Sequence, residues 1–297
     1  MTMTDSVKPT ALVLEGGAMR GLFSAGVMDV MMEHQIEFDG IIGVSAGAAF
    51  GCNFKSRQPG RALRYNKRFG SDPRYMGLRS LLRTGDLVGA EFAYHRLPME
   101  LDIFDCATFE NNPAEFITVS TDVDSGKPVY HRMDRVDYDE LEWMRASASM
   151  PVVTKPVEVG GRRLLDGGIS DSIPLKYMLD RGYRKCVVVL TQPRDYFKRP
   201  APRWFFSLAL RRYPAIADAM CRRHIMYNEQ LLYVAEQERL GNAFVIAPDS
   251  PLPIRRVDSD PAKMQRVYDM GVRLMQDSLD RLCQWLGSQA MIAKSSE

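Results

Sequence analysis

Ser45 stands at the centre of a G-x-S-x-G pattern, with Gly43 and Gly47 two positions away on either side. An apolar run precedes the pattern and a run of small residues follows it, as expected where a strand turns sharply into a helix. Such a turn requires small residues at both flanking positions, and it projects the serine hydroxyl near the positive end of the helix. The spacing predicts a nucleophilic serine, although a serine that merely caps a helix would occupy the same position.

A second group of small residues, Glu-Gly-Gly-Ala-Met-Arg-Gly at positions 15–21, directly follows the first apolar run of the chain. Glycines at such a place allow backbone amides to converge on an anion at the start of a helix. Two anions suit this arrangement: the phosphate of a dinucleotide, or the oxyanion of an acyl-transfer intermediate. The residues of interest in this loop are Gly16, Gly17, Ala18, Arg20 and Gly21.

The nucleotide interpretation of this loop has one observation in its favour and two against it. Asp39 lies near the distance along the chain at which a dinucleotide fold places its ribose-binding acid. Against it, Ala18 is a mismatch to the G-x-G-x-x-G fingerprint, and Ser45 would be left without a role. Both interpretations of the loop stay open at this point.

A serine nucleophile needs a base, and few residues of this chain could supply one. Asp166 precedes Gly167 and Gly168 after an extended segment, although an aspartate before two glycines is commonly a turn residue. Of the four histidines, only His224 follows Asp166, as the order of an α/β-hydrolase triad would require. His224 lies in a helical pattern without a glycine-rich loop to present it, so a histidine-based triad is poorly supported.

These residues need a scaffold that brings the ends of several strands together. Short apolar runs alternate with helical patterns through the first part of the chain, and continuous apolar runs are typical of strands buried on both faces. Strand, helix, strand in this order predicts a mostly parallel sheet covered by helices. The expected strands are 11–14, 40–43, 116–120 and 186–190, with shorter ones at 128–131 and 156–159, and the expected helices are 21–34 and 46–54.

The last third of the chain has a different texture. A loop rich in proline and charge precedes helical patterns at 207–240 and 260–286, with a strand pattern at 243–247 between them. We therefore expect a first domain over residues 8–194 and a mainly helical C-terminal extension over residues 195–297 that packs on it.

The composition narrows the class of protein. With 297 residues, 45% hydrophobic and 26% charged, the chain is typical of globular proteins and unlike collagen, low-complexity or disordered chains. A net charge of +2 gives no sign of a nucleic-acid partner. Five scattered cysteines favour a reducing, cytoplasmic location over a disulfide framework. We expect no signal peptide, because residues 1–10 are polar and lack an apolar run. We also expect no membrane span, because no window reaches the roughly 18 apolar residues that a span needs.

Two basic stretches predict a peripheral contact with an anionic membrane. Residues 55–85 contain nine Lys or Arg against one acid, and residues 198–212 place five around Trp204, Phe205 and Phe206. Basic charge beside exposed aromatic side chains suits an anionic lipid surface. The alternative is a solvated surface whose aromatic side chains pack into the core.

Taken together, the three glycine-containing motifs resemble those of the patatin-like phospholipases, and the resemblance covers about residues 10 to 190. That family is similar in its oxyanion loop with Lys or Arg before the last glycine, its G-x-S-x-G elbow and its Asp-Gly-Gly or Asp-Gly-Ala motif. Residues 146–151 and 120–126 resemble two weaker segments of the same family. The resemblance implies a three-layer α/β/α sandwich with a mostly parallel sheet, extended here by C-terminal helices.

In that family the aspartate of the last motif activates the serine without a histidine. Carried over, Ser45 would be the nucleophile and Asp166 the base. The family loop often has a third consecutive glycine where this chain has Ala18, which tolerates a positive φ less well. The remaining roles carried over are an oxyanion hole of Gly16, Gly17 and Ala18, a bracing Arg20, and supporting Gly21, Gly43, Gly47, Gly167 and Gly168.

The resemblance implies a hydrolase that cleaves lipid esters, with phospholipids the first candidates, through an acyl-enzyme. This chemistry needs no metal or organic cofactor, and the expected partner is a lipid ester substrate. Two other classes stay open: a nucleotide-binding protein that uses the loop at 16–21, and a non-catalytic lipid-binding protein of the same fold.

Overall fold

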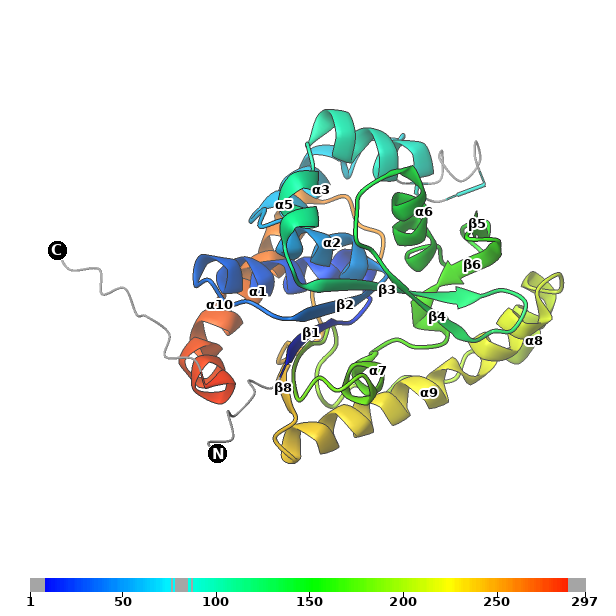
Figure 1. The fold of residues 1–297 in the computed structure, drawn as a ribbon. Helices are drawn as coiled ribbons and strands as arrows, with labels where there is room; N and C mark the ends of the chain where they lie inside the picture. Colours follow the sequence, from blue (N-terminus) through cyan, green and yellow to red (C-terminus); the bar gives the residue numbers. More distant parts are fainter. Residues whose placement is uncertain (1–8, 76, 78–84, 87, 288–297) are drawn as a thin grey trace, which may run out of the picture.

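One mixed β-sheet runs through the protein, whose computed structural model describes residues 9–287 except 76, 78–84 and 87 (Figure 1). The strand order is β5-β6-β3-β2-β1-β7-β8, and β4 pairs with β3 outside this path. Neighbours from β3 to β8 in this order are parallel, whereas β3–β4, β3–β6 and β5–β6 are antiparallel. The strands are β1 (Thr10–Leu14), β2 (Gly40–Val44), β3 (Glu115–Asp122), β4 (Pro128–Arg132), β5 (Val157–Val159), β6 (Arg162–Asp166), β7 (Lys185–Val189) and β8 (Ala243–Ile246).

The parallel strands are buried on both faces, as their continuous apolar runs predicted. Side chains alternate between the two faces of a strand, so each run supplies two separate cores. Leu12, Leu14 and Ile41 belong to one core, and Val13 and Ile42 belong to the other. The sheet therefore needs a layer of helices on each side.

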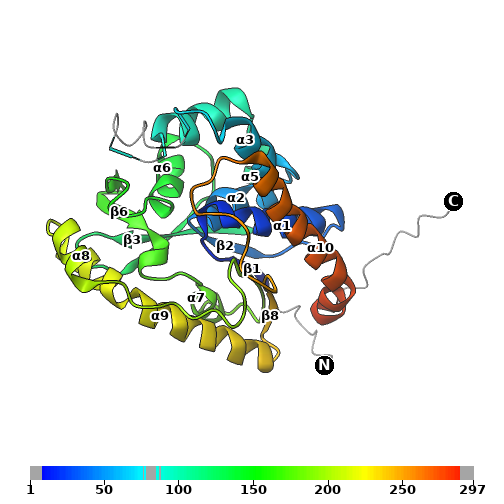
Figure 2. The same cartoon turned by 180° about the vertical axis from the view of Figure 1, so that it is seen from behind.

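Helices form those two layers, which confirms the predicted three-layer α/β/α class. Figures 1 and 2 show α1, α2 and α10 over one face of the sheet and α7 and α9 over the other. The first layer contains α1 (Gly21–Glu33), α2 (Ala46–Lys55), α3 (Arg61–Phe69), α5 (Cys106–Asn111) and α10 (Pro261–Leu286), and the second contains α7 (Leu175–Asp180) and α9 (Pro214–Arg239). Within the described part of the chain, no helix combines the length and apolar character that crossing a membrane requires.

The C-terminal segment contributes to the sheet and to both layers. Strand β8 adds to the sheet edge in parallel with β7, and α10 lies along α1, where the Tyr268 hydroxyl donates to Asp29 Oδ2 at 2.7 Å. The start of α10 is as predicted, because Asp260 caps it by accepting the Ala262 amide at 2.9 Å. The domain boundary near residue 194 stays a prediction.

The expected helix over 207–240 is two helices, α8 (Arg203–Ala209) and α9, and Pro214 is the first residue of α9. Elements that we did not predict include α3, α5, the π-helix η2 (Glu91–Leu101) and α6 (Tyr138–Ser147). A capping signal was available for α6, because the Asp137 side chain accepts the amide of Glu140, three residues later.

Candidate active site

Ser45 occupies the sharp turn between β2 and α2. Its backbone has φ +56° and ψ −121°, a left-handed conformation that is uncommon for a residue with a side chain. The flanking glycines are required by space, because a Cβ on Gly43 would lie 2.5 Å from the Ala48 nitrogen and one on Gly47 would lie 2.5 Å from the Leu14 oxygen. The backbone thus has the geometry expected of a nucleophile elbow.

Ser147, the last residue of α6, holds the elbow from the side. Its hydroxyl accepts the Ser45 amide at 3.0 Å and donates to the Val119 carbonyl of β3 at 2.6 Å. The contact joins residues 102 positions apart in the chain. From the sequence, Ser147 is singled out only as part of the 146–151 segment, and its contact with Ser45 is not predicted.

The strand register places Ser45 and Asp166 close together beside β3. Val44 of β2 pairs with Val119, and Asp166 of β6 pairs with the next residue, Ser120. Strands β2 and β6 follow one another along the same edge of β3, because β4 pairs with the other edge over residues 117–121. Asp166 is the last residue of β6, and it begins the 3₁₀ turn η3 (Gly167–Ile169).

The Asp166 carboxylate is buried and only partly hydrogen-bonded. Its Oδ1 atom accepts the Gly168 amide at 2.7 Å, whereas Oδ2 has no hydrogen-bond partner among the described residues. Burial raises the pKa of this carboxyl, and the nearby Ser45 hydroxyl and the Arg223 charge oppose that rise. The Ser45 hydroxyl thus lies near enough to act on the carboxylate without a close hydrogen bond to it.

The loop after β1 presents free amides beside Ser45. Among the described groups, none accepts a hydrogen bond from the backbone amides of Gly16, Gly17 or Ala18. Ala18 has φ +49°. Alanine adopts a positive φ less readily than glycine, as noted above for this position. Unpaired amides at such a loop can stabilise a developing oxyanion.

Residues after position 190 fasten this loop. The buried Glu15 carboxylate accepts the Tyr227 hydroxyl and the Thr191 amide, each at 2.6 Å. The Met19 amide donates to the Arg256 carbonyl at 3.3 Å, and Arg20 Nε donates to the Gly17 carbonyl at 3.4 Å. No local sequence pattern indicates that Glu15 and Tyr227 are in contact.

The other candidate residues lie away from Ser45. Asp39 accepts the Thr10 amide at 2.7 Å just before β2, at the opposite end of the parallel strands from the loop that follows β1. It therefore cannot serve a nucleotide bound at that loop. His224 lies on α9 with a buried, unpartnered Nδ1, and among the described residues no histidine lines a cavity that contains Ser45. The described part of the chain also holds no cluster of metal-ligating side chains.

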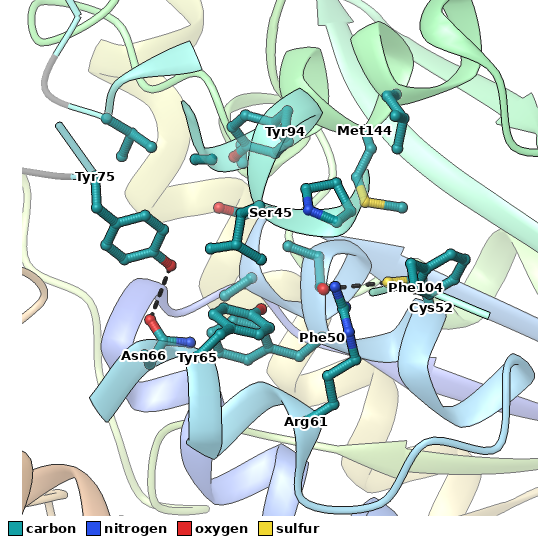
Figure 3. Close-up of a pocket in the computed structure, with 18 of the residues that line it drawn as sticks. Ser45, Phe50, Cys52, Arg61, Tyr65, Asn66, Tyr75, Tyr94, Phe104 and Met144 are labelled. Atoms are coloured by element: carbon teal, nitrogen blue, oxygen red, sulfur yellow. Dashed lines mark hydrogen bonds between the residues drawn. The ribbon is translucent and has the colours of Figure 1, made fainter. Parts of the chain in front are cut away.

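Two cavities meet at Ser45. The apolar cavity lies between α2, α3, η2 and α6, and Figure 3 shows its side chains around Ser45. The polar cavity lies between the loop after β1, η3 and the C-terminal segment. The residues that line both cavities are Ala18, Ser45, Val88, Ala148 and Arg256. The apolar cavity is lined by Phe50, Tyr65, Tyr94, Leu97, Phe104 and Met144, and the polar cavity by Arg20, Asp166, Lys198, Arg223, Tyr227 and Arg256.

The fold and site define a class: α/β proteins with a serine on a strand-to-helix elbow beside a free-amide loop and a buried aspartate. Residues 12–179 match the family model described as patatin-like phospholipase, and the chain belongs to that family of lipid hydrolases. Residues 213–287 match a second model, a domain of unknown function designated DUF6363.

Several known proteins are similar to the chain. The uncharacterized protein YjjU of Escherichia coli is 34% identical over 283 residues, which cover 88% of this chain and 74% of that protein. An uncharacterized NTE family protein of Mycobacterium tuberculosis is 32% identical over 56% of this chain and 44% of its own length. The lysophospholipase NTE1 of Cryptococcus neoformans is 27% identical over 66% of this chain and 12% of its own length.

Among solved structures, VipD from Legionella pneumophila aligns with 93% of this chain and 67% of its own chain. The TM-score of that alignment is 0.47 and the sequence identity is 12%.

Proposed function

We propose that the protein is a serine acyl hydrolase that cleaves lipid esters through Ser45 and Asp166. The observation that carries this proposal is the geometry of the pair. A strained elbow presents the serine, and a buried carboxylate, with one oxygen that has no hydrogen-bond partner among the described residues, lies beside it. The two come together because Val44 and Asp166 pair with consecutive residues along one edge of β3. A carboxylate short of hydrogen bonds is a competent proton acceptor for a neighbouring hydroxyl.

In the proposed reaction, Asp166 takes the proton of the Ser45 hydroxyl as Ser45 Oγ attacks the ester carbonyl. The amides of Gly17 and Ala18 stabilise the oxyanion, with Gly16 shaping the loop. The C–O bond of the ester then breaks, and the leaving alcohol takes the proton from Asp166. Water transfers a proton to Asp166 while it attacks the acyl-enzyme, and Ser45 recovers its proton as the fatty acid leaves.

The apolar cavity supports a long acyl chain as the part of the substrate held beside Ser45. Most of its lining side chains are aromatic or aliphatic. Arg61 is buried and bonded to the Asp102 carbonyl and the Asn53 side chain, and Arg256 lies where this cavity meets the polar one. An acyl chain gains about 0.8 kcal/mol for each methylene that it removes from water. The more specific activity that we propose is that of a phospholipase A, which releases a fatty acid from a phospholipid.

The test is hydrolysis of a short-chain neutral ester by purified variants. Ser45→Ala and Asp166→Asn should each lower kcat by at least about 10³-fold, and the double variant should be no slower than the slower single variant, because residues that act as a unit are not additive. Asp180→Asn and His224→Ala, which change a surface acid and the histidine that a triad would use, should retain most of the activity. Near-normal turnover by Asp166→Asn, or a loss in His224→Ala as large as in Ser45→Ala, would refute the pair.

We further propose that α8 brings this site to an anionic membrane. Trp204 and Leu208 are 70% and 66% exposed, whereas Phe206 is buried, so the helix presents an apolar face to solvent. Arginines flank that face at positions 199, 203, 211 and 212. The five unpaired cysteines support a cytoplasmic location for such a contact.

The other basic stretch contributes less to this proposal. Arg57, Arg64 and Arg74 each pair with a carboxylate, and Lys55 and Arg61 are buried. Arg79 and Arg83 lie outside the described residues.

Co-sedimentation of the Ser45→Ala protein with vesicles tests the contact without turnover. We expect binding to anionic vesicles that weakens with salt and with Trp204→Ala, but not with Leu232→Ala, which removes an exposed leucine of α9. Equal binding to neutral and anionic vesicles would argue against the contact.

A further inference from the structure

We propose that the polar cavity is a binding site for the phosphate group of the substrate, built largely by the C-terminal segment. Lys198, Arg223 and Arg256 of that segment and Arg20 of the loop after β1 form this phosphate subsite. The inference rests on the proposed function, since it assigns the substrate class of the same site: a phosphate-bearing lipid ester.

The first observation is that these four cations line one cavity and lack acidic partners. Within the described residues, none of them lies within 4.0 Å of a carboxylate oxygen. Elsewhere in the protein, grouped cations are paired: Arg61 and Arg64 share Asp102 at 3.2 and 2.8 Å. Cations that outnumber the carboxylates around them and form no ion pair favour an anion from outside the chain.

The second observation is that the nearby carboxylates are already engaged. Glu15 accepts hydrogen bonds from Tyr227 and Thr191, and Asp166 accepts the Gly168 amide. Neither carboxylate forms an ion pair with the cations of the cavity. These two carboxylates face four cations, so the cavity carries an excess of positive charge.

The arrangement of the cations is held by the protein. Arg223 Nε donates to the Gly168 carbonyl, which leaves its other guanidinium donors to the cavity. The Lys198 ammonium lies over the Tyr227 ring, 4.3 Å from its centroid. Burial, followed by the charges of Arg223 and Arg256, lowers the pKa of Lys198 to about 7, while Glu15 raises it and Arg20 lowers it. A bound anion would relieve this repulsion.

The position of the subsite indicates which anion it takes. Because both cavities include Ser45, an ester carbonyl at the serine would place its acyl chain in the apolar cavity and its alcohol part toward the cations. Guanidinium groups recognise phosphate by paired hydrogen bonds, and a phospholipid carries its phosphate on the alcohol side of the ester. A phosphate group on the alcohol side of the scissile ester would both lie beside the cations and accept their hydrogen bonds.

A pair of matched substrates tests the subsite: a monoacylglycerol phosphate and the monoacylglycerol with the same acyl chain. Arg256→Gln and Lys198→Gln should each lower the ratio of kcat/KM for the phosphate ester over the neutral ester by about tenfold, the effect of one charge-assisted hydrogen bond. Arg255→Gln and Arg184→Gln change surface cations that do not line the cavity, and they should leave the ratio unchanged. An unchanged ratio in Arg256→Gln and Lys198→Gln, or an equal fall in the two controls, would overturn the assignment.

Calorimetric binding to the Ser45→Ala protein separates the subsite from the reaction. Inorganic phosphate should bind, and adding Arg256→Gln should weaken its binding about tenfold. No binding of inorganic phosphate or of the phosphate ester would refute the subsite, even if the wild type hydrolyses esters. Binding of inorganic phosphate with no change in the substrate ratio would mean that the site takes free anions and not a headgroup. If Ser45→Ala hydrolysed esters normally, the proposed function would fail while the calorimetry still decided the subsite.

Discussion

The two cavities that meet at Ser45 differ in how the protein treats charge. In the apolar cavity the buried Arg61 is held by Asn53 and by the backbone and carboxylate of Asp102. Among the described residues, no carboxylate oxygen lies within 4.0 Å of the four cations that line the polar cavity. This difference supports the proposal that the site holds a substrate with one apolar end and one anionic end.

The cavities also come from different parts of the chain. Apart from Arg256, the first is lined by residues of the matched patatin-like region, and three of the four cations of the second lie beyond that region. Under the proposal, the acyl side of the site thus belongs mainly to the family core, and the C-terminal segment supplies most of the alcohol side.

The largest expected effect is that of pH on kcat/KM, because Asp166 lies beside Ser45, where the two cavities meet. Asp166 must be ionised to accept a proton, and burial raises its pKa above the ordinary value of 3.8. The value of kcat/KM for a neutral ester should therefore show an acid limb, falling as pH falls through that raised pKa. His224→Ala should show the same limb. A flat profile, or a limb that disappears in His224→Ala, would contradict the role of Asp166.

Tyr227→Phe tests whether the polar side supports the loop after β1. Removing the hydroxyl leaves a buried oxygen of Glu15 without its 2.6 Å donor, so the free energy of unfolding should fall by about 2 kcal/mol. Tyr233→Phe, on the same helix and without a described hydrogen bond, should have little effect. Equal denaturant midpoints for the two variants would show that the Glu15–Tyr227 contact does not fasten the loop.

Ala49→Phe tests the apolar side alone. Ala49 is on α2 and lines only the apolar cavity, so a phenyl ring there should exclude part of a long acyl chain. Loss of about two methylenes of burial corresponds to roughly tenfold in the ratio of kcat/KM for long over short esters. Ala107→Phe, on the exposed surface of α5, is the control. An unchanged preference would place the acyl chain elsewhere.

The smallest effect concerns Ala18, which lies where the two cavities touch. Its φ of +49° is more easily adopted by glycine, so Ala18→Gly should raise the free energy of unfolding, by at most about 1 kcal/mol. Ala90→Gly replaces an alanine at φ −52° and should lower it by a similar amount. Chemical denaturation measures both, and a loss in Ala18→Gly as large as that in Ala90→Gly would show that the loop is not strained.

Local patterns made the strands and the elbow predictable from the sequence. A continuous apolar run such as 186–190 is enough to indicate a buried strand. The spacing of Gly43 and Gly47 around Ser45 is likewise enough to indicate a tight turn. The contact between Ser45 and Ser147 joins segments that only the tertiary fold brings together, so no local pattern reveals it. The segment from α3 to η2 was interpreted by charge only, and its helices were missed.

The polar cavity could not be predicted for a related reason. Whether a cation is paired depends on which carboxylates the fold brings near it, and the sequence shows neither Asp102 beside Arg61 nor the lack of a partner at Arg256. Lys198, which we expected at a membrane surface, is half-buried and lines the cavity. The role that we propose for Lys198 follows from the residues around it in the cavity and not from its position in a basic stretch of the sequence.

The most direct test of the central claim is labelling by a fluorophosphonate probe, followed by mass spectrometry of the modified peptide. A serine activated by a base reacts with such a probe, whereas an ordinary capping serine does not. We predict one label per chain at Ser45, no label in Ser45→Ala, and labelling at least about 100-fold slower in Asp166→Asn. Labelling of Asp166→Asn at the wild-type rate, or no labelling of the wild type at Ser45, would contradict the account.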